Sequence, residues 1–396
     1  MAKIVIVGGG IGGLAAALAV ARQGHHVAVL ERADRFGEIG AGIQLAPNGI
    51  HALERLGLGE KVRARAVNVD ELRFMDGVTG EHVVSMPLTE SYRDRFGNPY
   101  VVVHRAELHT LLLEACQASP GIDLRGGATA AGYEQDGVHA SVVLTTGERV
   151  TGDAVVGADG INSALRRQLI ADGDPRVSGI TVYRAIIPME RVPAELRWNA
   201  VTWWAGPKCH FVHYPIAGGE YLNLAASSDD GVTAAFAGVP ATKAHVRREF
   251  AVLGDTPRRL LELGTDWKSW VLVDREPVDV WTDARVTLLG DAAHPMLHYA
   301  AQGACMGLED AVVLGDLLEC GADELAARFV EYNAARRART ARIQRLARES
   351  IQLWHPAGER ALARNRMLSS MSATDLHDYV AWMHGARQFD SPAVPA

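Results

Sequence analysis

The sequence lacks the features that mark several large classes of protein. Its 396 residues include four cysteines, at positions 116, 209, 305 and 320, with neither a C-x-x-C pair nor metal-ligand spacing. No run approaches the roughly 18–20 apolar residues that a transmembrane helix needs. Basic residues are outnumbered, 40 to 47, giving a formal net charge of −7. We therefore expect a cytoplasmic protein with reduced thiols, no metal site, no membrane insertion and no nucleic-acid partner.

What is present describes an ordinary folded protein with more than one domain. Hydrophobic residues make up 48% of the chain and charged residues 22%. The length exceeds one average domain and can bury a large core. No internal repeat is visible. The motifs must therefore carry the functional argument.

The first motif is a glycine-rich turn between two expected strands. The β-forming run 3–7 leads into glycines 8, 10 and 13, which fit G-x-G-x-x-G, and an Ala/Leu-rich helix follows. Such a turn needs Gly8 for its tight bend, Gly10 for close approach to a pyrophosphate and Gly13 for helix–strand packing. Glu31 ends the second strand eighteen residues after Gly13, where an acid can bind a ribose. This unit predicts a site for an adenine dinucleotide.

Two further motifs also follow apolar strands. Gly157-Ala-Asp159-Gly160 comes after the first of these strands, and Gly290-Asp291-Ala-Ala-His294-Pro295 after the second. Each alone is an ordinary turn at a strand end. We expect helices at about 48–56, 105–118 and 303–318, and strands at 100–104, 201–205, 209–216, 221–226 and 285–289, with two strands in 140–158. A run of arginines from Arg336 to Arg348 suggests a solvated or subunit-contacting helix.

Together, the three motifs in this order resemble the single-component FAD-dependent aromatic hydroxylases related to p-hydroxybenzoate hydroxylase. The resemblance covers essentially the whole chain and includes His104-Arg105, Tyr183-Arg184, Asp274-Arg-Glu-Pro277 and Ala301-Gln-Gly-Ala304. It implies an α/β fold: a Rossmann-like FAD-binding domain, an inserted β-rich substrate domain and a helical C-terminus. The boundaries we expect are 1–73, 99–175 and 276–340 for the FAD-binding parts, 74–98 and 176–275 for the substrate domain, and 341–396 for the C-terminal helices.

The resemblance also implies roles for individual residues around the flavin. Glu31 would hold the adenosine ribose, Arg105 would lie along the flavin and pyrophosphate, and Asp159 and Asp291 would lie near the phosphates and the ribityl chain. The backbone of Gln302, Gly303 and Ala304 would present a helix N-terminus to reduced flavin, whose negative charge it stabilises. The glycine-rich loop 37–42 would let the flavin ring approach. The full expected FAD-binding set is Gly8, Gly10, Ile11, Gly13, Glu31, Arg32, Arg105, Asp159, Asp291, Gln302, Gly303 and Ala304.

The expected strand 209–216 carries the residues that suit a phenol. Because side chains alternate along a strand, His210, Val212 and Tyr214 share one face, and Phe211 and His213 share the other. A His and a Tyr on one face can bind a phenolic ring, although both can equally be core polar residues. We expect His213 to be structural.

Within the family, this strand and the segments Asp291–Ala304 and Leu353–Pro356 most resemble the 3-hydroxybenzoate 6-hydroxylases. That implies that His210 pairs with the substrate hydroxyl, that Tyr214 binds the ring or carboxylate, and that Asp76 and Tyr100 line or support the cavity. His298 departs from the pattern, since many relatives have Pro there and some have Gln. A His keeps hydrogen-bonding ability and can itself act as a base.

These residues predict a monooxygenase reaction. The resemblance implies that NADH or NADPH reduces FAD transiently, that O2 then forms a C4a-hydroperoxyflavin, and that this oxidant attacks an electron-rich ring. A group that accepts the phenol proton speeds the attack, so we expect His210, His298 and Tyr214 to be the catalytic residues. The expected reaction converts 3-hydroxybenzoate, a small hydroxylated aromatic acid, to 2,5-dihydroxybenzoate (gentisate). Helices from about residue 340 onward can supply a homodimer contact.

Several alternatives fit part of the sequence. Salicylate 1-monooxygenase and 6-hydroxynicotinate 3-monooxygenase share much of the pattern. A flavin halogenase or reductase would use the same scaffold, although the Trp-x-Trp-x-Ile-Pro signature of halogenases is missing. A catalytically silent FAD-binding sensor would bind FAD and consume no NADH with any phenol. A plain NAD-dependent dehydrogenase explains the first motif and leaves the other two unexplained.

Overall fold

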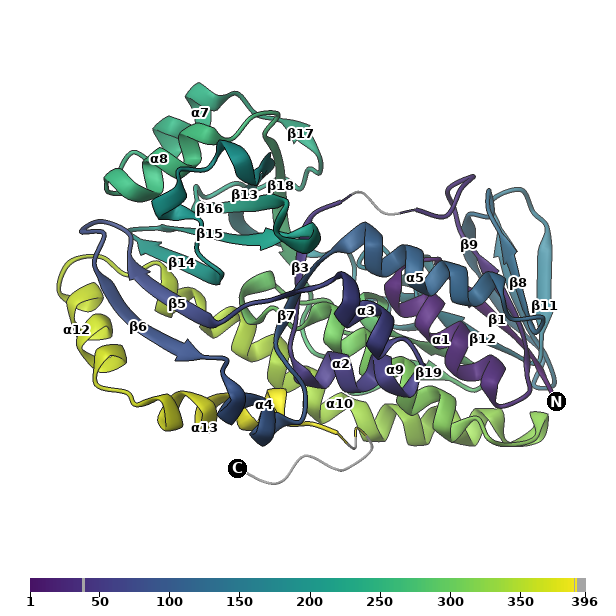
Figure 1. Cartoon of the computed structure of the whole chain (residues 1–396). Helices are drawn as coiled ribbons and strands as arrows, with labels where there is room; N and C mark the ends of the chain where they lie inside the picture. Colours follow the sequence, from purple (N-terminus) through teal and green to yellow (C-terminus); the bar gives the residue numbers. More distant parts are fainter. Residues whose placement is uncertain (38–39, 388, 390–396) are drawn as a thin grey trace.

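The structure, a computed structural model, describes residues 1–37, 40–387 and 389. Two sheets organise the chain (Figure 1). The first has the strand order β19-β20-β12-β1-β2-β8, and all its neighbours run parallel except β19. Its strands are β1 (Lys3–Val7), β2 (His26–Leu30), β8 (Ile122–Arg125), β12 (Ala154–Gly157), β19 (Thr282–Asp283) and β20 (Val286–Leu288). The second and third sequence motifs therefore follow strands of the same sheet as the first.

The helices of this part pack closely on one another through small residues. Helix α1 (Ile11–Arg22) is buried along most of its length and contacts α9 (Gly303–Leu317) and α5 (Arg105–Gln117). A Cβ added at Gly315 of α9 would lie 2.6 Å from Cβ of Ala19 in α1. Alanine and glycine at this contact let the two helix axes approach, which brings the start of α9 beside the glycine-rich turn.

The second sheet has eight strands in the order β17-β18-β13-β16-β15-β14-β5-β6. Every neighbouring pair is antiparallel except β14 with β5. The strands are β5 (Glu71–Asp76), β6 (His82–Pro87), β13 (Arg176–Pro188), β14 (Ala200–Gly206), β15 (Cys209–Ile216), β16 (Tyr221–Asp229), β17 (Val239–Pro240) and β18 (Lys268–Asp274). Figure 1 shows this sheet beside the parallel one, with α7 (Lys243–Glu249) and α8 (Asp255–Leu263) above it.

Two smaller sheets and further helices complete the fold. One three-stranded sheet contains β9 (Ala130–Gln135), β10 (Ala140–Leu144) and β11 (Arg149–Gly152), and the other contains β3 (Gly42–Leu45), β4 (Val67–Asn68) and β7 (Val101–His104). The remaining helices are α2 (Pro47–Arg55), α3 (Gly59–Arg65), α4 (Glu90–Phe96), α6 (Ala164–Leu169), α10 (Leu325–Glu349), α11 (Ile351–Trp354), α12 (Gly358–Ser369) and α13 (Ala373–His384), with short 3-10 turns at Gly290–Ala292 and His298–Ala300. Both α12 and α13 contact β6 (Figure 1).

The expected fold class is confirmed: a parallel sheet, an antiparallel β-rich sheet and a helical C-terminus. One expectation about the strands was wrong. Residues 140–158 hold three strands rather than two, because a bend at Asp153 divides the last stretch into β11, in the three-stranded antiparallel sheet, and β12, in the parallel sheet. The domain boundaries stay a prediction. The expected loop 37–42 lies partly outside the described residues, since Glu38 and Ile39 are not among them.

The arginine-rich helix α10 was also misjudged. Arg336 is fully buried and pairs with Glu309 and Asp310 of α9. Arg339 pairs with Glu309 as well. The arginines on the opposite face of α10, such as Arg337, are exposed. One side of the helix therefore carries arginines that pair with buried acids, and the other side carries arginines exposed to solvent. The sequence pattern alone does not distinguish the two.

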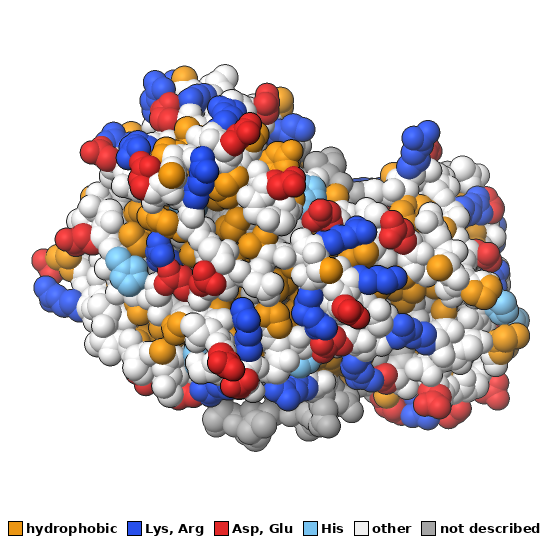
Figure 2. Space-filling model, in the orientation of Figure 1, with side chains coloured by type: hydrophobic (Ala, Val, Ile, Leu, Met, Phe, Trp, Pro, Cys, Tyr) orange, Lys and Arg blue, Asp and Glu red, His pale blue; other side chains and the backbone are white. Residues whose placement is uncertain are grey.

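Side chains of both charges cover the visible face of the molecule (Figure 2). Lysines and arginines alternate there with aspartates and glutamates, so this face carries no large field of one sign. In the part of the chain that the structure describes, no helix is long and apolar enough to cross a membrane.

Candidate active site

The three glycine-containing motifs meet at the carboxyl ends of β1, β12 and β20. Gly8 has a φ of +109°, and a Cβ there would lie 2.3 Å from the carbonyl oxygen of Ala158. A Cβ at Gly13 would lie 1.9 Å from the carbonyl oxygen of Gly8. Gly307 of α9 lies against both Gly12 and Gly290, since its added Cβ would be within 3.9 Å of their Cα atoms. Ligands of open α/β sheets bind at this edge, so the structure places the predicted dinucleotide motif where the fold can use it.

Glu31 lies at the end of β2 and holds the turn after β1. Its carboxylate accepts hydrogen bonds from the backbone N–H of Gly9 at 2.8 Å and of Ala33 at 3.0 Å. Two lone pairs remain for the hydroxyls of a ribose. Arg32, the next residue, is exposed. The geometry of Glu31 fits its predicted role, and cofactor binding by either residue stays a prediction.

Two acids from the other motifs lie at the same edge. One carboxylate oxygen of Asp159 accepts from the N–H of Ala164 at 2.8 Å, while the other is buried without a partner among the described residues. Burial raises the pKa of Asp159. It also raises the pKa of Asp291, against the opposing effects of His294 and Arg105. Because Asp291 is accessible to solvent although protein surrounds it, it lines a deep opening.

Helix α9 begins at this opening. Gln302 is its N-cap residue, and the free N–H groups of its first turn include those of Gly303 and Ala304. A Cβ added at Gly303 would meet no atom within 4 Å, so an aromatic ring edge can approach the backbone there. The side-chain amide of Asn48, in α2, donates to the side-chain oxygen of Gln302 at 2.8 Å and to the carboxylate of Glu309 at 2.7 Å. Asn48 therefore positions the start of α9, a role that the sequence analysis missed.

The antiparallel sheet supplies the second half of the site. The register places Asp76, Ala205, His210 and Ser227 side by side across β5, β14, β15 and β16. His210 makes ring contacts with Tyr299 at 5.1 Å, His298 at 5.8 Å and Trp354 at 5.8 Å between centroids. The expected alternation of β15 is confirmed, because Phe211 and His213 pack on the opposite face against Trp204 and Trp198.

The hydrogen bond that His210 makes within the protein goes to the C-terminal segment. His298 lies edge-on to His210, and the hydroxyl of Ser227 lies 3.4 Å from Nε2 of His298. His210 instead bonds through Nδ1 to Nε2 of His355, at 2.9 Å. His355 follows α11, far along the chain, so only the packing of the C-terminal segment brings it here.

All three imidazoles are neutral at neutral pH. Burial lowers the pKa of His298 to about 3, with Arg184 and His355 adding to the effect, and lowers that of His355 to about 4. Burial, helped by the two neighbouring histidines, holds the pKa of His210 well below its usual range. A neutral imidazole offers one bare ring nitrogen, which is the acceptor that a phenol hydroxyl needs.

Tyr214 and Tyr100 are joined through β3. The hydroxyl of Tyr214 donates to the carbonyl of Gly42 at 2.7 Å, and the N–H of Gly42 donates to Asn223 at 3.1 Å. The hydroxyl of Tyr100 donates to Gln44 at 2.6 Å. Tyr214 lies on the same sheet face as His210, while Tyr100, which directly precedes β7, contacts β3 through Gln44. Both tyrosines thus hold the strand that follows loop 37–42.

Asp76 is engaged in local structure. One oxygen accepts from the N–H groups of Val78 and Thr79 in the turn after β5, and the other accepts from Asn365 of α12 at 2.7 Å. These hydrogen bonds and Arg364 keep the pKa of Asp76 low although burial opposes them. Asp76 therefore supports the site by fixing α12 to the end of β5.

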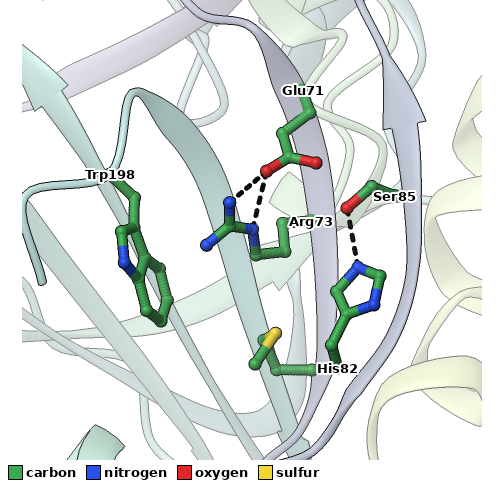
Figure 3. Close-up of a pocket in the computed structure, with 6 residues that line it drawn as sticks. Glu71, Arg73, His82, Ser85 and Trp198 are labelled. Carbon is green, nitrogen blue, oxygen red and sulfur yellow. Dashed lines mark hydrogen bonds and ion pairs between the residues drawn. The ribbon is translucent and has the colours of Figure 1, made fainter. Parts of the chain in front are cut away.

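A hollow of about 360 Å³ lies on the other face of this sheet (Figure 3). It is lined by Glu71, Arg73, Met75, His82, Ser85 and Trp198. Arg73 pairs with Glu71 and lies 4.4 Å from the ring of Trp198, and His82 lies 2.8 Å from the hydroxyl of Ser85. Its strand residues point away from the face that carries His210, and its charges are paired. It is therefore separate from the candidate active site.

Comparison with known proteins agrees with this geometry. The family described as FAD binding domain matches residues 1–347. 3-Hydroxybenzoate 6-hydroxylase 1 of Aquipseudomonas alcaligenes is 48% identical over 97% of both chains, and 3-hydroxybenzoate 6-hydroxylase of Polaromonas naphthalenivorans is 42% identical over 96% of this chain and 95% of its own. The chain belongs to the FAD-dependent aromatic hydroxylases. Among solved structures, Klebsiella pneumoniae HpxO complexed with FAD and uric acid superposes with a TM-score of 0.83 at 26% identity, covering 95% of each chain.

The residues present fit FAD. The close approach at Gly8 and Gly13 leaves backbone N–H groups of α1 for a pyrophosphate, and Glu31 is placed for the ribose. The buried, unpartnered oxygen of Asp159 can accept a hydrogen bond from a ligand hydroxyl. Arg105 links this region to the antiparallel sheet, because it acts electrostatically on Asp291 and also on Arg184, which shares the sheet face of His210. An FAD-dependent hydroxylase needs cofactor and substrate to lie close together.

Sequence reasoning missed three residues of this hydroxylase site. Arg184, quoted only as part of a family motif, lies on the sheet face of His210, and its Nε is buried without a partner among the described residues. Burial lowers its pKa, with Tyr214 opposing and Arg105 adding to the effect. Asn48 and His355 are the other two. The sequence analysis quoted Tyr183-Arg184 and the segment that contains Trp354-His355 as parts of family motifs. The neighbouring residues in the sequence do not indicate which distant side chains Arg184 and His355 contact.

Proposed function

We propose that this protein hydroxylates 3-hydroxybenzoate at carbon 6 to give 2,5-dihydroxybenzoate. The observation that carries the proposal is the 48% identity, over almost the full length of both chains, to a 3-hydroxybenzoate 6-hydroxylase. The site supports it, because His210 and Tyr214 share one face with the cation Arg184. A phenolic acid needs both a hydroxyl acceptor and a positive charge, and this face offers both.

FAD, once reduced by NADH or NADPH, supplies an electrophilic oxygen atom derived from O2. The chain's own residues prepare the ring for it. In 3-hydroxybenzoate, carbon 6 lies para to the hydroxyl and so gains electron density when that hydroxyl gives up its proton. His210, neutral and buried, accepts this proton, and His298 lies within ring contact as a second polar group.

The other side chains orient the ring and exclude water. Arg184 lies on the same sheet face as His210, one same-face row away, where its cation can bind the carboxylate. Tyr214 lies one same-face row further along β15, where its ring can border the substrate while its hydroxyl stays bonded to Gly42. An apolar wall is formed by three aromatic rings. The ring centroid of Trp354 lies 5.0 Å from that of Phe74 and 5.5 Å from that of Trp203. This wall keeps water from the oxidant, which would otherwise be lost as hydrogen peroxide. Trp354, from the C-terminal segment, thus completes a wall whose other two rings come from the antiparallel sheet.

Product identification tests the proposal. FAD-loaded protein is turned over in air with NADH and 3-hydroxybenzoate, and the products are separated and quantified. We expect gentisate in near-stoichiometric yield with NADH. If NADH is consumed and only hydrogen peroxide appears, 3-hydroxybenzoate is not the substrate. Parallel reactions with salicylate, which would give catechol, and with 6-hydroxynicotinate then identify the alternative.

We also propose that the protein acts in the cytoplasm as a homodimer. The cysteines are free thiols, which suits a reducing compartment. Leu362, Met367 and Tyr379 on the C-terminal helices are exposed, at 48%, 54% and 60%. Such side chains can form a contact between two copies. Light scattering coupled to size-exclusion chromatography gives the mass directly, and a monomeric mass of 42.6 kDa would contradict the dimer.

A further inference from the structure

His355 is the hydrogen-bond partner of His210, and the reaction proposed above does not assign it a role. Its Nε2 lies 2.9 Å from Nδ1 of His210. Its Nδ1 is buried and has no partner among the described residues. The segment is anchored, because the N–H of Lys208, at the start of β15, donates to the carbonyl of His355 at 3.0 Å. The ring is therefore held in place beside His210.

A hydrogen bond between two neutral imidazoles contains one proton, so it has two forms. If His355 donates, the single proton of His210 is on Nε2, so His210 can only donate to the substrate. If His210 donates, its Nε2 is a bare acceptor for the substrate hydroxyl. Among the described residues Nε2 of His210 has no hydrogen-bond partner. A substrate hydroxyl that donates its proton therefore selects the second form.

We propose that His355 is a positioning residue for the hydroxylation: it accepts Nδ1–H of His210, so that His210 presents a bare Nε2 to the substrate hydroxyl, and it takes over that Nδ1 proton during oxygen transfer. This inference rests on the proposed function. The O–H bond of the substrate breaks as an N–H bond forms at Nε2 of His210. The Nδ1–H bond of His210 breaks as an N–H bond forms at Nε2 of His355. One proton thus moves from the substrate to His210 and another from His210 to His355, and the positive charge ends on His355.

The surroundings determine when this proton moves. Four side chains face the pair: His298 and Tyr299 from the turn before α9, Ser227 from β16 and Trp354 from α11. Two charged groups act on them electrostatically. In addition to the larger effect of burial, Arg184 of β13 lowers the pKa of His298, and Asp229 of β16 raises the pKa of Tyr299. Burial lowers the pKa of His355 to about 4. A phenol has a pKa of about 10. The pair therefore binds the substrate as a neutral phenol, and the proton transfers only when attack on the ring makes the hydroxyl strongly acidic.

Ligand pairs test the positioning role without turnover. Binding of 3-hydroxybenzoate and of benzoate to oxidised holoenzyme is followed by flavin difference absorbance in wild type, His355→Phe and His355→Gln. Phe removes the acceptor, so we expect the preference for the hydroxylated ligand to fall about tenfold. Gln keeps a carbonyl acceptor and should retain the preference. A purely structural role would weaken both ligands equally in each variant, which would overturn the proposal.

Turnover then tests the proton transfer. Gln cannot take up a proton, so His355→Gln should bind 3-hydroxybenzoate normally while its yield of gentisate per NADH falls at least tenfold. Gln352→Ala, an exposed position on α11, is the matched control and should behave as wild type. Wild-type yield in His355→Gln would overturn the transfer step. If wild type itself makes no gentisate, the proposed function fails instead, and the ligand-pair result still decides whether His355 orients His210.

A carbon-13 label at the hydroxyl-bearing carbon of 3-hydroxybenzoate adds an independent readout. The chemical shift of this carbon distinguishes phenol from phenolate. We expect the phenol shift in the complex with wild-type oxidised holoenzyme from pH 6 to pH 8. A phenolate shift at pH 7 would show that the proton leaves before oxygen transfer and would overturn the late transfer to His355.

Discussion

At the scale of single residues, His210 combines the properties that the reaction requires of an acceptor. It is only 3% exposed, its pKa is held low by burial, and His355 leaves it one free ring nitrogen. Its neighbours on β15 have other tasks, since His213 packs among aromatic rings on the opposite face. One strand thus carries, three residues apart, a histidine that we propose to be reactive and a histidine that packs among aromatic rings.

Replacing His210 by Ala should separate oxygen transfer from cofactor reduction. We expect gentisate formation to fall by about 10²–10⁴-fold, because the proton acceptor is lost, while NADH is still consumed and hydrogen peroxide is released. The measurement is the ratio of gentisate to NADH. His82→Ala, on the far face of the sheet, is the control. A wild-type ratio in His210→Ala would remove His210 from the mechanism.

At the scale of secondary-structure elements, the turn between β1 and α1 and the contact of α9 with α10 decide whether the cofactor can bind. The first depends on the absence of a side chain at Gly13. The second depends on charge, since Glu309 and Asp310 of α9 are completely buried and are balanced by Arg336, Arg339 and His294. Both arrangements fix the position of a helix N-terminus next to the opening.

Gly13→Ala should displace α1 from β1. Its Cβ would lie 1.9 Å from the carbonyl oxygen of Gly8, which is backbone and cannot move aside. We expect FAD content after purification to fall below a tenth of wild type, measured from the flavin absorbance per protein. Gly121→Ala, where the nearest atom would be 3.4 Å away, should keep its FAD. Full FAD content in Gly13→Ala would mean that the turn relaxes.

Arg336→Met should destabilise the protein by about 3–5 kcal/mol, because it leaves buried acids without their cation. The measurement is the midpoint of unfolding in urea, compared with wild type. Arg337→Met changes the neighbouring exposed arginine and should shift stability by less than about 0.5 kcal/mol. Equal effects of the two substitutions would contradict a structural role for the buried ion network.

At the scale of the whole molecule, several buried histidines are kept neutral. Burial lowers the pKa of His213, His298 and His384 to about 3 and that of His355 to about 4. Their unfolded pKa is near 6.5. Between about pH 4 and 6.5 the unfolded chain therefore binds more protons than the folded one, so stability falls as the pH is lowered through this window.

His213→Phe should flatten this dependence. Neither ring nitrogen of His213 has a partner among the described residues, so Phe can replace it among the aromatic rings around it. We expect the loss of stability from pH 6.5 to pH 5 to shrink by up to about 1.4 kcal/mol per pH unit. Urea midpoints at both pH values measure it, with the exposed His139→Gln as control. An unchanged slope would show that His213 is protonated in the folded state.

What the sequence determined by itself is what short-range geometry controls. The turn at Gly8–Gly13, the strand-end acids and the two faces of β15 follow from spacing along a few residues, and so the fold class and family could be predicted. The partner of His210, the burial of Arg336 and the position of Arg184 could not. His210 and His355 are 145 residues apart. Only tertiary packing, which depends on how whole elements fit against one another, decides which distant side chains meet.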